Sequence, residues 1–227
     1  GEAAPSPNDE YLLYQTLIAA CPDTFDQDDD LAEVRTRVIT YMYKAINEAK
    51  VHSNWVNPND AYAEAIADFV THILSNTAFR ESFDPFQQRV AFFGRFNAVS
   101  QALLKITSPG VPDIYQGCEL LDYSLVDPDN RRPVDFGARR KLLDSLDRRR
   151  KADQRQLARE LVDEAHTGAI KLYTIQRTLL FGRDHEAIFR DGSYQPVWAD
   201  GPNADHICAF VRQTAYTCVF VVAPRLS

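Results

Sequence analysis

One stretch of the sequence, Ser108 to Asp135, most limits how this chain can fold, because it interrupts a helical pattern with one short strand and a long polar loop. Val111, Ile114 and Tyr115 are typical of a buried strand, and the prolines and glycines around them restrict it to about five residues. The loop that follows is rich in charge and has only a few apolar anchors. Ordered loops of this length usually bind something, so we expect this one to carry function.

The residues on either side of this stretch predict helices, because apolar side chains recur at spacings of three and four. The helices expected before it are Glu10–Ala20 after an Asp9 cap, Leu31–Ala49 after an acidic loop at Asp26–Asp30, one starting with the Asn57 cap and Pro58, and one starting with the Asp84 cap and Pro85. Beyond it, the expected helices are a charged one from an Asp135 cap to about Leu157, and another around Leu172, Ile175 and Leu179.

The pattern changes toward the end of the chain, where short runs rich in β-branched and aromatic residues alternate with turn residues. These runs are YQPVWA, HICAFVRQ and TCVFVVAP, and the turns between them lie around Gly201 and between Gln213 and Tyr216. Antiparallel strands fit this pattern best. The predicted fold class is therefore α+β, mostly helical at first and with a small antiparallel sheet at the end.

Composition narrows the class of protein. With 45% hydrophobic residues among 227, the chain can fill a core, and no apolar run approaches the roughly 20 residues needed to cross a bilayer, so no membrane partner is expected. The net charge of -7 argues against a nucleic-acid partner, which needs a positive face. Cys21, Cys118, Cys208 and Cys218 lack the spacing of metal ligands. We therefore expect buried free thiols, a cytoplasmic location, and neither metal nor cofactor.

The sequence around the predicted strand resembles a known group of enzymes. The residues that match the G-x-P-x-I-Y-x-G-x-E pattern at the eighth barrel strand of the alpha-amylase superfamily are Gly110, Pro112, Ile114, Tyr115, Gly117 and Glu119. Within that superfamily, the continuation DPDNRRPVD is most similar to the maltooligosyltrehalose synthase family. Two further stretches, EYLLYQTL at residues 10–17 and KAINEAKVHSNWVNP at residues 44–58, resemble the same family.

The resemblance implies a domain organisation. Residues 1–185 would be the C-terminal part of a (β/α)8 catalytic barrel with helical insertions, including its last β/α unit, and residues 186–227 would begin a small C-terminal β-domain. Both ends of the sequence look cut, so we expect the chain to belong to a longer polypeptide. Apolar faces around Leu17, Phe92 and Phe96 would then be left uncovered, which favours self-association of the isolated piece.

Residues just after the predicted strand are candidates for binding sugar. Active sites of such barrels lie at the C-terminal ends of the strands, which places Gln116, Glu119 and Asp122 on the substrate side. Their side chains are suitable partners for sugar hydroxyls. Alternatively, Glu119 satisfies backbone donors of the loop and Asp122 caps a turn.

A second candidate group, Lys50, His52 and Trp55, lies in an irregular stretch between two predicted helices. The indole ring is suited to stacking on a sugar, and the lysine and histidine can form hydrogen bonds with it. A lone histidine is, however, more often a structural residue. The resemblance favours the sugar-binding role, and the structural alternative stays open.

The charged segment DPDNRRPVD is expected to hold itself in one shape. Arg131 and Arg132 can form planar, bidentate pairs with the acidic residues around them, and the loop-ordering candidates are Asp127, Asp129, Asn130 and Asp135. Either arginine can also reach a sugar hydroxyl. Loop-ordering and substrate-binding roles are therefore both expected for this segment.

By resemblance, the parent protein is an isomerase that converts the reducing-end α-1,4 linkage of a maltooligosaccharide into an α,α-1,1 trehalose linkage through a covalent glycosyl-enzyme intermediate. The superfamily takes its catalytic carboxylates from barrel strands four, five and seven, which we expect to lie outside this sequence. No catalytic residue is therefore predicted here, and the chain alone is expected to be inactive. The alternatives are another alpha-amylase-superfamily hydrolase or transglycosylase, or a non-catalytic carbohydrate-binding domain.

Overall fold

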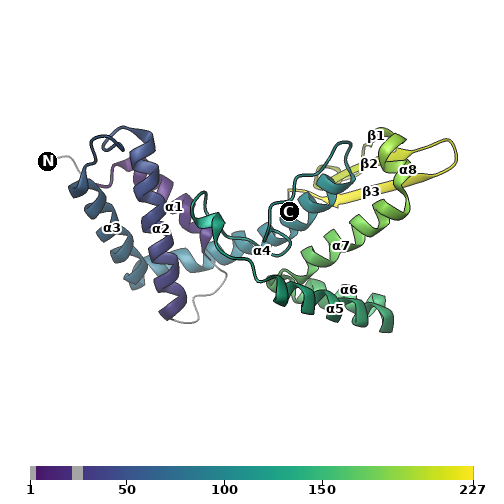
Figure 1. Cartoon of the computed structure of the whole chain (residues 1–227), viewed down its shortest axis with the longest axis horizontal. Coiled ribbons are helices and arrows are strands. Elements are labelled where there is room, and N and C mark those ends of the chain that lie inside the picture. The colour runs from purple at the N-terminus through teal and green to yellow at the C-terminus, as the bar shows by residue number, and fades with distance from the viewer. Residues whose placement is uncertain (1–3, 22–27, 227) are drawn as a thin grey trace. The chain divides into compact units, whose positions relative to one another are not determined.

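The computed structural model describes residues 4–21 and 28–226, and for residues 28–30 it describes the backbone alone. The chain divides into two compact units, residues 1–91 with 123–133 and residues 92–122 with 134–227. The described structure is mostly helical with a small antiparallel sheet, as predicted (Figure 1). The domain boundary expected at residues 185 and 186 stays a prediction.

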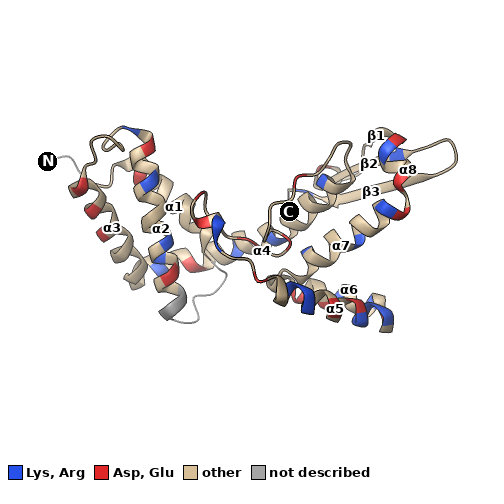
Figure 2. Ribbon diagram, in the orientation of Figure 1, with Lys and Arg blue, Asp and Glu red and all other residues tan. Residues whose placement is uncertain are grey.

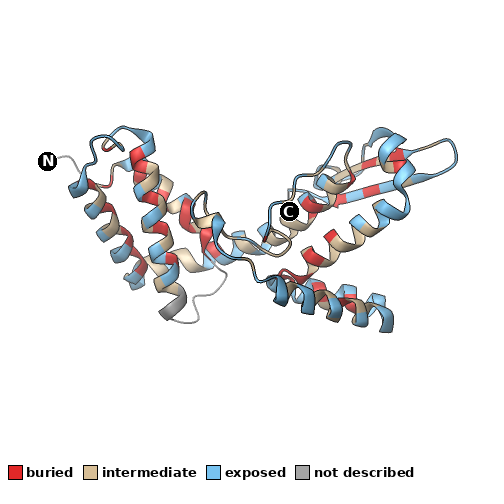
Figure 3. Ribbon diagram, viewed as in Figure 1, coloured by how far each residue is buried: buried red, intermediate tan, exposed pale blue. Residues whose placement is uncertain are grey.

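The first unit packs α1 (Pro7–Ala20), α2 (Asp28–Ala49) and α3 (Asp60–Ser75) around one core (Figure 3). Within each helix most of the buried apolar side chains follow one another at spacings of three or four, which places them on one face. The buried residues of this core include Leu13, Leu17, Val34, Val38, Met42, Ile46, Ile66, Val70 and Ile73. The spacing of apolar residues in the sequence thus agrees with the core faces of α2 and α3, whereas α1 also has an exposed face that includes Tyr11.

The second unit begins within α4 (Thr77–Thr107), which starts in the first unit. It continues with α5 (Phe136–Ala152), α6 (Gln154–Asp163), α7 (Ala169–Asp184) and α8 (Glu186–Asp191), and with β1 (Ser193–Val197), β2 (Ile207–Gln213) and β3 (Cys218–Pro224). The strands form one antiparallel sheet in the order β1-β2-β3. All three predicted strands are therefore confirmed.

Several predicted helix starts are wrong by a few residues because other polar side chains form the caps. Ser6, not Asp9, accepts the N–H of the first turn of α1, with Pro7 at the first helical position. Helix α3 starts at Asp60 under an Asn59 cap, because the side chains of Ser53 and Asn54 bind backbone N–H groups of residues 56, 57 and 59 and keep them in a turn. The Asp135 cap of α5 is confirmed.

Three predicted element boundaries need larger corrections. Pro85 does not start a helix: α4 begins at Thr77, where Asn76 accepts the N–H of Phe79, and continues through the proline. The helix expected to reach Leu157 is two helices, because Asp153 ends α5 and caps α6. Residues 28–30 of the expected acidic loop belong to α2, and residues 26 and 27 lie outside the described residues.

The expected buried strand at Val111–Tyr115 is not a strand in the part of the chain that the structure describes. A strand requires a neighbour for its backbone groups, and the three described strands pair with one another elsewhere. Val111 and Tyr115 are accordingly exposed rather than buried. The segment is an extended stretch whose Asp113 carbonyl accepts a hydrogen bond from Lys105 Nζ at 2.8 Å.

The four cysteines are free thiols, as expected. Cys21 is fully buried, and burial raises the pKa of its thiol to about 12. The expectation of burial is confirmed for Cys21 only: Cys118 and Cys208 are partly buried, and Cys218 points to the exposed side of β3. No helix among the described residues is long and apolar enough to cross a bilayer.

Candidate functional site

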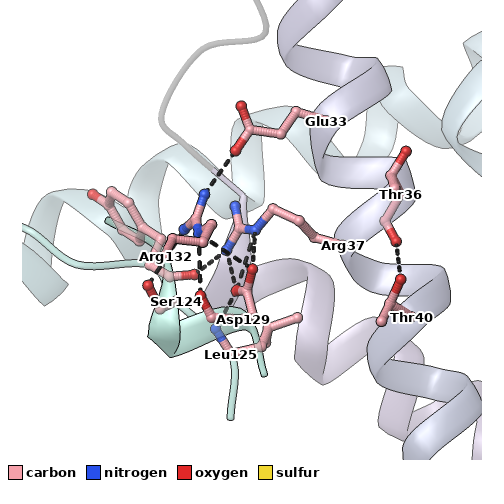
Figure 4. Close-up of polar contacts among 9 residues, drawn as sticks. Glu33, Thr36, Arg37, Thr40, Ser124, Leu125, Asp129 and Arg132 are labelled. Carbon is pink, nitrogen blue, oxygen red and sulfur yellow. Dashed lines mark hydrogen bonds and ion pairs between the residues drawn. The ribbon is translucent and has the colours of Figure 1, made fainter. Parts of the chain in front are cut away.

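The loop of residues 123–133 lies against α2 and is held there by Arg37 (Figure 4). Arg37 Nε donates to Asp129 Oδ1 at 3.0 Å, and its Nη2 donates to Asp129 Oδ2 at 2.9 Å and to the Tyr123 carbonyl at 2.6 Å. Asp129 Oδ2 also accepts the Leu125 N–H at 2.7 Å. This bidentate pair joins residues 92 positions apart in the sequence.

The adjacent arginines of the loop have different partners. Arg132 donates to Glu33 of α2 at 2.8 Å, to the Asp129 carbonyl at 3.1 Å and to Ser124 Oγ at 3.3 Å. Arg131 pairs with Asp127. Lys44 of α2 donates to the Asp127 carbonyl at 2.6 Å. Both arginines are therefore tied within the loop or to α2, although their side chains remain 71% exposed for Arg131 and 45% for Arg132.

The other two loop-ordering candidates lie apart from these pairs. Asp135 accepts the Ala138 N–H at 2.8 Å as the cap of α5. The Asn130 side-chain oxygen is buried and has no hydrogen-bond partner among the described residues. The prediction that Asp127 and Asp129 contact the arginines agrees with the observed pairs, whereas Asp135 orders the start of a helix instead.

Basic and acidic side chains are equally represented in the ion pairs among the described residues of this cluster. These ion pairs join Arg37, Lys44, Arg131 and Arg132 with Glu33, Glu48, Asp127 and Asp129. Burial would raise the pKa of Asp129, but the hydrogen bonds from Arg37 and the Leu125 N–H outweigh it and hold that pKa below its ordinary value. The carboxylate is thus ionised at neutral pH. Basic and acidic residues are likewise interspersed along α2 in Figure 2.

The second candidate group occupies the turn between α2 and α3. Lys50 is exposed and adopts the left-handed conformation at φ 58°, which ends α2 sharply. The His52 ring stacks on Tyr62 with centroids 4.6 Å apart, and Trp55 packs edge-on against Tyr43 at 5.7 Å. The Trp55 side chain is 55% exposed and can present a ring face to a sugar, whereas His52 serves the packing of this unit.

The third candidate group, in the second unit, follows a tight turn at Gly117. Its positive φ of 93° suits glycine, and an added Cβ would lie 3.2 Å from Val134 Cγ2. Arg139 of α5 donates to the Gly117 carbonyl at 2.9 Å and to Glu119 Oε2 at 3.2 Å. Glu119 is therefore held by an arginine rather than by loop N–H groups. Gln116 and Asp122 are exposed.

A small hollow of about 180 Å³ lies beside this turn and contains residues that sequence reasoning missed. Cys118 and Ile114 line it together with Lys105 of α4 and Lys171 of α7. Lys171 donates to the Leu120 carbonyl at 3.1 Å, and burial lowers its pKa from the ordinary value. No sequence signal singles out Lys171, because its role depends on how α7 packs against the turn.

Arg37 and Arg139 are the other residues that the sequence analysis missed. Both lie within amphipathic helices, where an arginine is normally read as part of a solvated face. The DPDNRRPVD motif indicated that acidic residues of the loop need basic partners, but not that one partner comes from α2. Among the described residues, no cluster of three or more His, Cys, Asp or Glu is arranged to hold a metal ion.

No family model matches this chain. Curated proteins do: putative maltooligosyl trehalose synthases from two strains of Mycobacterium tuberculosis are each 36% identical over 211 residues, which cover 92% of this chain and 24% of theirs. The chain thus spans about a quarter of the length of the curated relatives it matches.

Solved structures of maltooligosyl trehalose synthases are also similar to this chain. A maltooligosyltrehalose synthase from Arthrobacter ramosus is 34% identical with a TM-score of 0.76, over 96% of this chain and 25% of that one. A hypothetical maltooligosyl trehalose synthase from Sulfolobus tokodaii is 31% identical with a TM-score of 0.73, over 96% of this chain and 27% of that one. The resemblance noted in the sequence is therefore confirmed: nearly the whole length of this chain matches about a quarter of the length of maltooligosyl trehalose synthases.

Proposed function

We propose that this chain is the C-terminal portion of an isomerase that converts the reducing-end α-1,4 linkage of a maltooligosaccharide into an α,α-1,1 trehalose linkage. The observation that carries the proposal is 36% identity to maltooligosyl trehalose synthases over 92% of the chain. The loop cluster is consistent with it. Among the described side chains, the basic and acidic members of these ion pairs offset one another, which suits a neutral, hydroxyl-rich substrate better than an anion.

In the proposed reaction, the bond from the terminal glucose O4 to the next anomeric carbon breaks, and a carboxylate nucleophile takes up that carbon as a covalent glycosyl ester. A carboxylic acid gives its proton to the departing O4. The freed glucose then turns so that its O1 hydroxyl attacks the same carbon. The glycosyl ester bond breaks and releases the nucleophilic carboxylate, while the O1 proton passes to the carboxylate that gave its proton to O4. No water enters, so substrate and product are isomers.

We assign binding, not bond breaking, to this chain. The nucleophile and the acid would come from barrel strands encoded elsewhere in the whole protein, and the extended segment Val111–Tyr115 would lie beside them. Gln116, Glu119 and Asp122 would then contact the sugar near the end of this segment. Within the first unit, Arg131, Arg132 and Trp55 are separately proposed to bind sugar, the arginines through hydrogen bonds and the indole ring by stacking.

Two further proposals concern location and association. Free thiols that include the exposed Cys218 favour a reducing compartment such as the cytoplasm. Of the residues expected on uncovered apolar faces, Leu17 is fully buried and Phe96 is partly buried, whereas Phe92 is exposed. Exposed apolar side chains such as Phe86, Phe92 and Val111 favour self-association of the chain when it is separated from the rest of the protein.

Product analysis of the whole protein tests the proposed function. Incubation with maltopentaose should consume reducing ends without release of glucose, and the product should have unchanged mass and resist reduction by borohydride. Release of glucose or of shorter reducing sugars as the main outcome would identify a hydrolase or another transglycosylase instead. Unchanged maltopentaose would leave the non-catalytic carbohydrate-binding alternative.

A further inference from the structure

We propose that Arg37 is a positioning residue: it holds the loop of residues 123–133 in the shape that presents Arg131 and Arg132 to an uncharged oligosaccharide. The inference rests on the proposed function and assigns a role to a residue of α2 that belongs to none of the candidate groups found in the sequence. We call Arg37, Asp129 and the backbone groups they bind the α2 clamp.

The α2 clamp fixes the loop at three points with one guanidinium and one carboxylate. Arg37 donates to the Tyr123 carbonyl, where the loop begins, and to both carboxylate oxygens of Asp129, six residues later. Asp129 in turn accepts the Leu125 N–H. Residues 123–129 are therefore closed into one shape, because the planar fork of arginine allows these bonds only in a narrow range of orientations.

Burial separates the clamp from the groups it positions. The side chains of Arg37 and Asp129 are 13% and 11% exposed, so little water competes for their hydrogen bonds. Arg131 and Arg132 are several times more exposed. The buried Arg37 and Asp129 are thus suited to fixing the loop, and the exposed Arg131 and Arg132 are suited to contacting a ligand.

Helix α2 is a rigid base for this arrangement. Glu33, Arg37 and Lys44 follow one another at spacings of four and seven, which places them along one side of the helix, and each binds a different part of the loop. Val34 and Val38, on the core side of the same helix, are buried in the first unit. Helix α2 therefore connects the loop to the core of the first unit.

A hollow of about 160 Å³ lies beside the clamp, between α2 and the loop. Thr36, Thr40 and Tyr41 line it on the helix side, and Val126 and Pro128 line it on the loop side. A lining of both polar and apolar residues suits a hydroxyl-rich ring with apolar faces, and the paired charges of the described residues favour an uncharged ligand.

Loss of the clamp should weaken binding rather than slow the chemical step. If the loop samples many shapes, the apparent affinity falls by the fraction of molecules in the competent shape, and the bound complex then reacts as before. KM should therefore rise while kcat changes little. If Arg37 had only a structural role, its replacement would lower the amount of folded enzyme and the rate together, and KM would not rise separately from kcat.

The experiment uses the whole protein to which this chain belongs, with Arg37→Lys and Asp129→Asn as test variants. Arg35→Lys is the matched control, since Arg35 is an exposed arginine two positions away on α2. Steady-state kinetics with maltopentaose give KM and kcat. Limited trypsin digestion with mass spectrometry measures cleavage of the bond between Arg131 and Arg132. This cleavage requires the loop to open. The bond between Arg132 and Pro133 resists trypsin because a proline follows it.

We expect the test variants to be cut at Arg131 on the order of tenfold faster than the wild type and to show a KM raised about tenfold, with kcat within about twofold. The control should match the wild type in both measurements. Unchanged cutting would overturn the clamp whatever the kinetics. Faster cutting with unchanged KM would overturn the positioning role. Absence of trehalose-forming activity in the wild type would defeat the proposed function and this role with it, while the digestion would still decide whether the clamp exists.

Discussion

At the scale of single residues, the two adjacent arginines of the loop are not equivalent. Arg132 uses three of its nitrogens to reach Glu33, Ser124 and the Asp129 carbonyl, whereas Arg131 makes one ion pair with Asp127 at the surface. Exposed ion pairs contribute little to stability, and a planar fork with several partners contributes more. Arg132 is therefore the more informative residue to change.

Replacement of Arg132 by Lys in the whole protein should lower kcat/KM on the order of tenfold while the protein stays folded. Lysine keeps the charge but cannot reach three partners from one plane, and the loss of one charge-assisted hydrogen bond is worth about that factor. Steady-state kinetics and far-ultraviolet circular dichroism measure the two outcomes. Arg140→Lys, on the exposed surface of α5, is the control; equal activity of Arg132→Lys and this control would show that Arg132 is a surface residue without a role in the reaction.

At the scale of secondary-structure elements, the attachment of the loop to α2 should depend on pH. The pKa of Asp129 lies below its ordinary value of 3.8 because Arg37 and the Leu125 N–H bind the carboxylate. A carboxyl group with a lowered pKa in the folded state contributes stability that is complete above the unfolded pKa and is lost as the pH falls through the folded pKa. The contribution should therefore persist at neutral pH and disappear only in acid.

Urea unfolding of the wild type and Asp129→Asn, from pH 7 to pH 2.5, tests this dependence. The wild type should be more stable by roughly 1.5–3 kcal/mol at pH 7, and the difference should shrink only below about pH 4. Asp68→Asn, an exposed change on α3, should show no such difference. A difference that grows toward acid pH, or that never appears, would contradict the ion pair between Asp129 and Arg37.

A buried arginine connects three elements of the second unit. Arg212 of β2 is 2% exposed and donates to carbonyls at the ends of helices: Thr107 of α4 at 3.3 Å, and Phe189 and Gly192 at the end of α8 at 2.7 and 3.1 Å. The negative ends of the two helix dipoles favour a cation there. The side chain thus attaches the sheet to both helices.

Replacement of Arg212 by Lys should destabilise the chain by roughly 1.5–3 kcal/mol in urea unfolding, because one ammonium group cannot reach all three carbonyls and leaves buried acceptors unsatisfied. Arg190→Lys, on the exposed surface of α8, should have little effect. Equal stability of the two variants would show that these carbonyls do not depend on Arg212.

Prediction from sequence succeeded where the determining forces are local and failed where they are not. The spacing of Val34, Val38 and Met42 identified the core face of α2, because helical periodicity is written in neighbouring residues. Pro85 misled, because a proline is common at a helix start but is also tolerated within a long helix whose surroundings hold it. The sequence around Pro85 does not distinguish the start of a helix from a position within one, because the packing of the helix decides between them.

At the scale of the whole molecule, the candidate site could be predicted only in part, because some of its contacts join residues far apart in the sequence. The motif DPDNRRPVD indicated an ordered, charged loop, and Arg37 could not be assigned to it because the two lie 92 positions apart. Val111–Tyr115 has the composition of a strand, but a strand also needs a neighbour, and the described part of this chain supplies none. Non-local partners decide both cases, and a sequence pattern does not specify them.

The division of labour proposed for the whole molecule places substrate contacts in this chain and the catalytic carboxylates elsewhere. Its most direct test is to incubate the purified chain, and in parallel the whole protein, with maltopentaose and to separate the products by chromatography. We predict a non-reducing, trehalose-ended product from the whole protein and none from the chain alone, because loss of the nucleophile and the proton donor removes orders of magnitude in rate. A trehalose-ended product formed by this chain alone would contradict the proposal and show that the catalytic groups lie within its 227 residues.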